Sequence, residues 1–133
     1  MKNKSRWREF NDRSKYRLVD LGRPAVFYIP ENKLNIIIGG ETVEEYLQNF
    51  LSREFGAFTS SVVANFGLWI NKQRVVYRDR HRVYEVSFEG KNRIPALLER
   101  IAEVARIVDE ECIYFKAGQY SCLVYPAGAQ RQY

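Results

Sequence analysis

The chain has few of the residues that usually carry catalysis or hold metal ions. It contains one histidine, His81, and two cysteines, Cys112 and Cys122. A structural zinc site needs about four ligands, so these side chains cannot complete one alone. Both cysteines have mostly apolar neighbours, where a thiol stays protonated and inert. We therefore predict no metal, no cofactor and no catalytic residue.

Long apolar runs and an apolar leader are also lacking. No run approaches the roughly 20 residues that a membrane-spanning helix needs. The first segment, Met1 to Arg17, is basic and polar and has no apolar stretch behind it. This composition differs from a secretory signal, so we expect a cytoplasmic protein without membrane contact.

Acidic residues are fewer than basic ones, which gives a formal net charge of +5. A basic chain favours anionic partners, and we expect nucleic acid or an acidic protein surface. The predicted anion-binding residues lie in the first segment and in one strand: Arg6, Arg8, Arg13, Lys15, Arg17, Arg74, Arg78, Arg80, His81 and Arg82. Nearby aromatic residues that could stack on bases are Trp69, Tyr77 and Tyr84. The alternative is a solvated charged segment whose arginines pair with Asp79 and Glu85.

The first patterned segments predict a strand and a helix. Leu34 to Ile38 is rich in β-branched residues and is bounded by glycines, which is typical of a central strand. Thr42 and Glu45 have the spacing of a capping box, and Gly56 suits the left-handed end of a helix. Before them, Ala25 to Ile29 is a short apolar run closed by Pro30, which suggests an additional edge strand.

Two long strands and a second helix follow. Phe58–Ile70 and Arg74–Phe88 alternate in hydrophobicity, with a short hairpin connection at residues 71–73. Charge interrupts the alternation between Arg78 and Arg82, so we expect a bulge or a departure from the sheet there. The apolar stripe from Leu97 to Val108 predicts a helix, with Pro95 in its first turn.

The end of the chain allows two interpretations. The helix could continue through residues 112–117, because Cys112 and Phe115 keep its apolar spacing. We prefer a hairpin, since acidic residues at 109–111 are unfavourable at a helix C-terminus. Its loop would be residues 116–118, with Gly118 left-handed. Cys112 would then lie opposite Cys122, on an apolar face with Tyr114 and Tyr120, as free thiols.

Together these elements predict an α+β fold of the ferredoxin-like plait type, in the order β-α-β-β-α-β. Such a fold has an antiparallel sheet with two helices on one face. We divide the chain into a basic N-terminal arm (1–24), a single plait domain (25–126) and a C-terminal tail (127–133). The sheet face opposite the helices would stay open, which suggests a homodimer or a larger complex through that face.

The segment from Asn35 to Gly56 resembles the opening of an RNA-recognition motif, with its strand, its Gly39-Gly40 pair and its acidic-start helix. That family carries a basic-Gly-aromatic motif in its third strand. Here Arg82–Phe88 offers Tyr84 and Phe88 but no matching glycine, and the first strand has no aromatic residue. We attribute the resemblance to plait geometry that both share.

These observations favour a non-enzymatic binding or assembly protein that contacts nucleic acid or a ribonucleoprotein through the arm and the Arg-rich strand. The first alternative is a self-associating or protein-binding regulatory or inhibitor domain. The second is a small plait-fold enzyme such as a nuclease, for which the chain offers few chemical groups.

Overall fold

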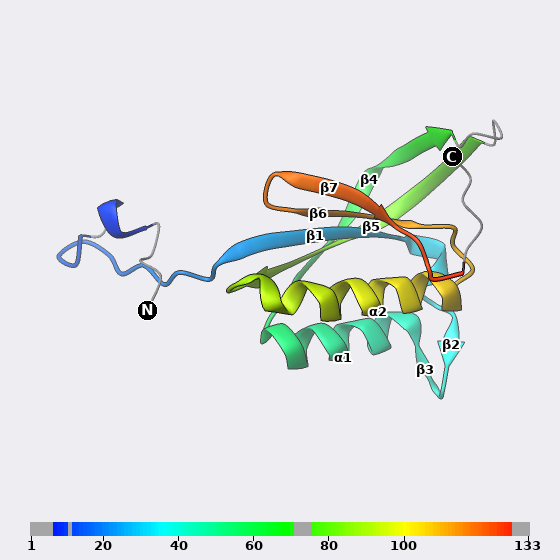
Figure 1. Ribbon diagram of the computed structural model, residues 1–133, viewed down its shortest axis with the longest axis horizontal. Helices are drawn as coiled ribbons and strands as arrows, with labels where there is room; N and C mark the ends of the chain where they lie inside the picture. The colour runs from blue at the N-terminus through cyan, green and yellow to red at the C-terminus, as the bar shows by residue number, and fades with distance from the viewer. Residues whose placement is uncertain (1–6, 11, 71–75, 129–133) are drawn as a thin grey trace.

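The computed structural model describes residues 7–10, 12–70 and 76–128, with side chains between 63 and 79 left out of the description. A five-stranded antiparallel sheet has the order β4-β5-β1-β6-β7. Both helices, α1 (Val43–Phe55) and α2 (Ile94–Ile107), cover one face of this sheet (Figure 1). The predicted α+β class is therefore confirmed.

The strand bounds are β1 (Arg23–Pro30), β4 (Thr59–Ile70), β5 (Val76–Phe88), β6 (Ile113–Ala117) and β7 (Tyr120–Val124). Two short strands, β2 (Ile37–Ile38) and β3 (Glu41–Thr42), form a separate small hairpin. Single turns of 3₁₀ helix occur at Arg8–Phe10, Glu31–Lys33 and Lys91–Arg93. None of the helices in the described part of the chain is both long enough and apolar enough to span a bilayer.

The central strand of the sheet is β1, which corrects the prediction. Its alternate residues Ala25, Phe27 and Ile29 are fully buried, and it pairs with β5 on one edge and β6 on the other. The predicted central strand, Leu34–Ile38, instead begins as a turn after the 3₁₀ turn Glu31–Lys33, and only Ile37–Ile38 forms a strand, half of the small hairpin. The predicted order therefore began with the wrong segment, because the Ala25–Ile29 run, expected as an additional edge strand, is the central strand.

Helix α1 begins and ends where local chemistry predicts. The Thr42 side chain accepts a hydrogen bond from the Glu45 backbone N–H at 3.1 Å, and the Thr42 N–H donates to the Glu45 carboxylate at 3.2 Å. Gly56 ends the helix with a φ of 79°, a left-handed conformation that glycine adopts without strain. The capping box and the glycine cap are both confirmed.

The predicted irregularity in the long hairpin lies on the other strand. Residues Val76 to Arg82 of β5 stay in the sheet, and the register shifts between Val62 and Phe66 of β4. The extra β4 residues form a bulge opposite the charged segment of β5. The predicted connection at residues 71–73 lies outside the described residues.

The C-terminal hairpin is confirmed, but the predicted register of its two strands is wrong. Ala117 pairs with Tyr120 and Phe115 with Cys122, so the turn is Gly118 and Gln119. Gly118 has a φ of 60°, as predicted. Because side chains alternate, the shift puts Ile113 and Phe115 in the core and leaves Tyr114 exposed. Both cysteines are free thiols, and Cys122 is exposed.

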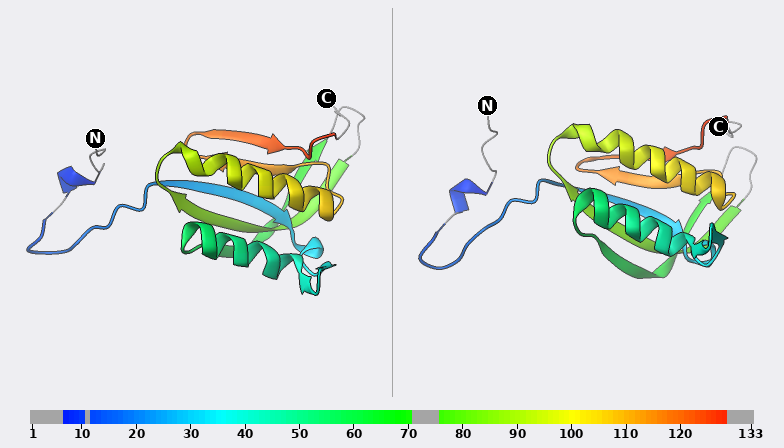
Figure 2. Two further views of the ribbon diagram at one scale, coloured as in Figure 1. Left: turned by 60° about the horizontal axis from the view of Figure 1, so that its bottom comes forward. Right: turned by 90° about the horizontal axis from the view of Figure 1, so that it is seen from below.

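One hydrophobic core lies between the sheet and the helices. The right-hand view of Figure 2 shows from below that the two helices lie side by side across this face of the sheet. Helix α1 contributes Leu47, Phe50 and Leu51 to it. Helix α2 contributes Leu97, Ile101, Val104 and Ala105. The matching 3.6-residue stripes of the sequence are what place these side chains on one face.

The opposite sheet face is uncovered in the described part of the chain. The Tyr28 ring meets the Tyr114 ring edge-on, with centroids 5.3 Å apart, and Leu123 pairs with Tyr114 on the same face. Tyr114 and Leu123 are 39% and 43% exposed. Association of copies through this face stays a prediction.

The hairpin register can be tested with two neighbouring substitutions. Phe115→Ala should lower the free energy of unfolding by about 3–5 kcal/mol, because it empties a core position. Tyr114→Ala should lower it by about 1 kcal/mol, since it removes an edge contact on the open face. Denaturant unfolding measures both changes. A larger loss for Tyr114→Ala would instead support a loop at residues 116–118.

Candidate functional site

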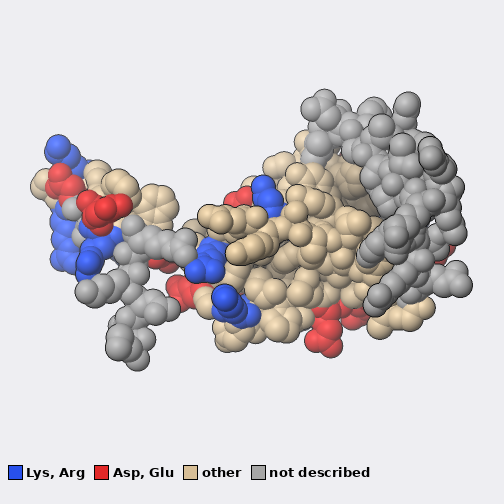
Figure 3. Space-filling model, turned by 45° about the horizontal axis from the view of Figure 1, so that its top comes forward, with Lys and Arg blue, Asp and Glu red and all other residues tan. Residues whose placement is uncertain are grey.

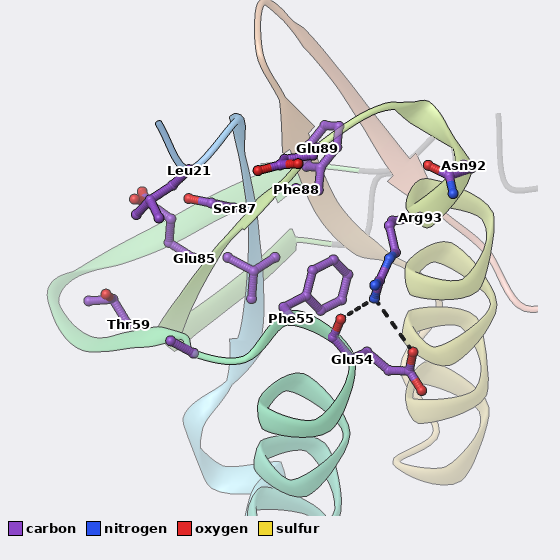
Figure 4. A pocket seen from close by; sticks show the side chains of 12 residues that line it. Leu21, Glu54, Phe55, Thr59, Glu85, Ser87, Phe88, Glu89, Asn92 and Arg93 are labelled. Atoms are coloured by element: carbon purple, nitrogen blue, oxygen red, sulfur yellow. Dashed lines mark hydrogen bonds and ion pairs between the residues drawn. The ribbon is translucent and has the colours of Figure 1, made fainter. Parts of the chain in front are cut away.

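A pocket of about 590 Å³ opens where one end of the sheet meets the ends of both helices (Figure 4). Its walls come from the arm, the end of α1 and the turn after it, the start of β4, the end of β5, and the residues between β5 and α2. The lining residues are Leu21, Glu54, Phe55, Ala57, Thr59, Glu85, Val86, Ser87, Phe88, Glu89, Asn92 and Arg93. This volume is within the range of small-molecule sites.

Arg93 ties the two helices together on one side of the pocket. Its Nη1 donates a hydrogen bond to the Glu54 carbonyl and lies 3.7 Å from the Glu54 carboxylate. The guanidinium also lies over the Phe55 ring, 5.9 Å from its centroid. Figure 4 shows these three side chains grouped together. The C-terminus of α1 and the N-terminus of α2 are thereby held at a fixed separation.

Gly22 brings the arm against the sheet beside the pocket. A Cβ at this position would lie 2.1 Å from the Phe88 carbonyl oxygen, and the Gly22 φ is +86°. Both the close approach and the left-handed backbone require glycine. The Gly22 N–H donates to the Asp20 carboxylate at 2.8 Å, which fixes the preceding turn. Leu21 is therefore held at the rim as part of the pocket wall.

The pocket is acidic although the chain as a whole is basic. Three lining residues are glutamates, Glu54, Glu85 and Glu89, against one cation, Arg93. Arg93 already pairs with Glu54. Glu85 and Glu89 are exposed, and neither has an ion-pair partner among the residues the structure describes. Two uncompensated carboxylates would attract a cationic ligand.

The predicted anion-binding residues do not form one surface. Arg8, Arg13, Lys15 and Arg17 lie on the exposed arm, which projects away from the domain (Figure 1). In Figure 3, Lys and Arg gather on that arm, at the left. Arg6 and Arg74 lie outside the described residues, as do the side chains of Trp69, Tyr77 and Arg78.

The described arginines of β5 pair with carboxylates of the protein itself. The Arg82 Nη1 is 2.6 Å from the Glu44 Oε2, and the Arg80 Nε is 3.7 Å from the Glu31 Oε2. His81 is half-buried, with its ring edge-on to Tyr28 at 6.0 Å. These ion pairs reduce the positive charge that β5 could offer to a phosphate.

Tyr84, predicted as a stacking residue, lies in the core. Its side chain is fully buried and stacks on Phe27, with centroids 5.4 Å apart, so a base cannot reach it. Burial raises the pKa of Tyr84 to about 12; the nearby Glu44 adds to the shift and Arg82 opposes it. The buried hydroxyl has no hydrogen-bond partner of good geometry among the described residues, although Ser60 and Arg82 lie close to it.

Other chemistry is sparse in the described part of the chain. No group of three or more His, Cys, Asp or Glu residues there is placed to hold a metal ion. Burial raises the pKa of the Cys112 and Cys122 thiols, which keeps both protonated at neutral pH. The Tyr46 hydroxyl donates to the Glu103 carboxylate between the helices, and burial raises its pKa. The pocket is thus the candidate site.

Two solved structures share this fold. One is a phage SAM lyase in complex with S-methyl-5′-thioadenosine: its TM-score is 0.53 and its sequence identity 12%, covering 87% of this chain and 98% of that chain. The other is a phage SAM lyase in the apo state, with a TM-score of 0.52 and 12% identity, covering 82% and 93%. No family model matches the chain. No curated protein sequence matches it either.

At this identity the likeness establishes the fold alone. The leading expectation of a non-enzymatic binding or assembly protein is contradicted by this comparison, because both matched structures are of an enzyme. The alternative of a small enzyme agrees with the comparison, although a nuclease reaction has no support from it. The partner predictions, nucleic acid or an acidic protein surface, stay untested.

Sequence reasoning missed the pocket residues. Glu54 lies in α1, Glu85 in β5, and the other three, Glu89, Asn92 and Arg93, between β5 and α2, and the five show no common spacing. Glu85 entered only as an ion-pair partner for arginines. The one available signal was the pair of glycines, Gly22 and Gly56, that bend the chain at both sides of the pocket.

The buried hydroxyl of Tyr84 gives a prediction about pH. The folded-state pKa is raised above the ordinary value of 10.0, so the folded chain holds this proton more tightly than the unfolded chain does. The resulting stabilisation is complete below pH 10 and is lost as the pH rises toward 12. Wild type should therefore lose more unfolding free energy over this interval than Tyr84→Phe, in which nothing titrates at this position.

Thermal or denaturant unfolding over that pH interval measures the difference between the two proteins. Tyr84→Phe should also fold at neutral pH without loss of stability, because it removes a buried hydroxyl that has no well-placed partner. Parallel pH profiles for the two proteins would contradict the burial of this hydroxyl.

Proposed function

We propose that this chain is a lyase that binds S-adenosylmethionine (SAM) in the pocket between β5 and the helix ends and releases S-methyl-5′-thioadenosine. The observation that carries the proposal is the acidic pocket itself, with the unpaired carboxylates of Glu85 and Glu89 in a chain of net charge +5. The shared fold supports the proposal, since a phage SAM lyase has it.

The pocket chemistry fits the charges of SAM. This substrate carries one positive charge on the sulfonium and one on the α-ammonium group, against one carboxylate. Glu85 and Glu89 can bind the ammonium group through charge-assisted hydrogen bonds. The Phe55 ring offers an apolar surface for the nucleoside, and Ser87, Thr59 and Asn92 offer polar groups.

The bond that breaks joins the sulfonium sulfur to the four-carbon amino-acid chain. Its electron pair moves to sulfur, which becomes the neutral thioether of S-methyl-5′-thioadenosine. A lyase adds no water, so the departing fragment must supply an electron pair to the carbon that sulfur leaves. That pair comes from its own carboxylate, which closes a ring, or from an adjacent C–H bond, whose proton a base accepts.

Positive charge on sulfur disappears in this step, which limits what the glutamates do. A carboxylate held against the sulfonium would stabilise the substrate more than the transition state and would slow cleavage. We therefore assign Glu85 and Glu89 to the ammonium end of the substrate. This role lowers KM and leaves kcat largely unchanged.

The proposal is tested by incubating the full chain with SAM and measuring S-methyl-5′-thioadenosine by chromatography. Wild type should release the thioether, and the double variant Glu85→Gln/Glu89→Gln should bind SAM about tenfold more weakly. Affinity for the neutral thioether should change much less, because that molecule carries neither positive charge. The matched control, Glu99→Gln, removes an exposed carboxylate of α2 outside the pocket.

Two results would contradict the proposal. One is an absence of both SAM binding and thioether release by the wild-type chain. The other is an equal loss of affinity for SAM and for the thioether in the double variant, since that pattern would reflect a damaged pocket and not a lost charge interaction.

A further inference from the structure

We infer that the backbone of Ser87, on the open edge of β5, selects adenine, a 6-aminopurine, as the base of the bound nucleoside. The Ser87 backbone N–H and C=O would pair with the ring N1 and the 6-amino group of adenine. The inference rests on the proposed function for the identity of the ligand. The position and direction of the two backbone groups come from the strand pairing alone.

The pairing of Pro24 fixes the direction of the Ser87 backbone. The Pro24 carbonyl accepts a hydrogen bond from the Gly118 N–H at 3.2 Å, so it points toward the β6–β7 turn and away from β5. Pro24 lies opposite Ser87 in the β1–β5 register. In an antiparallel ladder, a residue pair that is not hydrogen-bonded turns its N–H and C=O groups outward on both strands. Ser87 therefore presents both groups on the edge of β5 that faces β4.

Among the described residues, no strand pairs with that edge at Ser87. The β4–β5 pairing ends at Thr59 opposite Glu85, and Ala57, which would come next, has left the ladder. Ala57 and Ser87 both line the pocket, so this part of the β5 edge borders it. Figure 4 shows Ser87 among the lining residues. A donor and an acceptor thus lie side by side, and no β4 residue pairs with them.

Adenine has the matching pattern on one edge. Its 6-amino group donates and its N1 accepts, so the base can bond to the Ser87 C=O and N–H at the same time. Hypoxanthine has the opposite pattern, with an acceptor at position 6 and a donor at N1. Bound in the same pose, it would set acceptor against acceptor and donor against donor, which leaves polar groups unpaired.

Neighbouring side chains place the base plane at this edge. Phe55 lines the same pocket and offers a ring face on which a base can stack. The Arg93 guanidinium holds that ring from the side of α2. Stacking accepts any base, so the discrimination must come from the two backbone groups.

The ligand-side test compares three thioethers by calorimetry with the full chain: S-methyl-5′-thioadenosine, its hypoxanthine analogue and its N6,N6-dimethyl analogue. The adenine compound should bind at least about tenfold more tightly than either analogue. The hypoxanthine analogue loses both hydrogen bonds, and the dimethyl analogue loses the one from the 6-amino group and sets two methyl groups against the Ser87 C=O. Equal binding of all three would overturn the inference and leave the proposed function standing. Binding of none would overturn both.

The protein-side test uses two substitutions at the same position. Ser87→Ala removes the hydroxyl and keeps the backbone groups, so the preference for adenine over hypoxanthine should persist. Ser87→Pro removes the N–H that would donate to N1 and keeps the C=O, so the preference should fall but not vanish, because the C=O still distinguishes the 6-amino group from the 6-oxo group. Loss of the preference in Ser87→Ala would overturn the inference, because the hydroxyl would then be the reader. If Ser87→Pro fails to fold, the analogue series decides alone.

Discussion

The burial of β1 between two other strands is the constraint on which the rest of the structure depends. Phe27 is fully buried at its centre and stacks on Tyr84 of β5. The β1–β5 register runs without a break from Arg23 opposite Phe88 to Pro30 opposite His81. Because side chains alternate along a strand, this register decides that Tyr84 faces the core while Glu85 faces away from it. The orientation of the pocket residue Glu85 therefore depends on how Phe27 and Tyr84 pack in the core.

The pocket itself exists because neighbouring strands end at different points. β5 continues to Phe88 in order to pair with Arg23, whereas β4 ends at Thr59, opposite Glu85. Gly56 turns the chain out of α1 before β4 begins, which keeps the edge of β5 open there. A row of unpaired backbone groups is usually a liability in a sheet. At the wall of a small-molecule site, the same groups offer hydrogen bonds that a ligand can use.

Prolines explain why β1 was predicted as an edge strand and not as the central one. Pro24 and Pro30 flank the run, and proline is expected at edges because it cannot donate to a ladder. Both positions turn their backbone nitrogen toward β6, as the hydrogen bond from Gly118 to the Pro24 carbonyl shows. The β1–β6 pairing extends only from Ala25 to Phe27, so neither proline interrupts it. By contrast, the capping box and the glycine end of α1 were predictable because they depend on residues close in sequence.

The site could not be predicted in the same way, because total charge does not describe a local field. The leading prediction treated the arginines of β5 as free cations, and its alternative paired them with Asp79 and Glu85. The structure instead pairs Arg82 with Glu44 and Arg80 with Glu31, which lie far away in the sequence. Most described cations of the arm project away from the domain. At physiological salt, charges separated by more than about 8 Å are largely screened. A cationic ligand at the pocket therefore responds mainly to Glu85 and Glu89, and a chain of net charge +5 can still attract it.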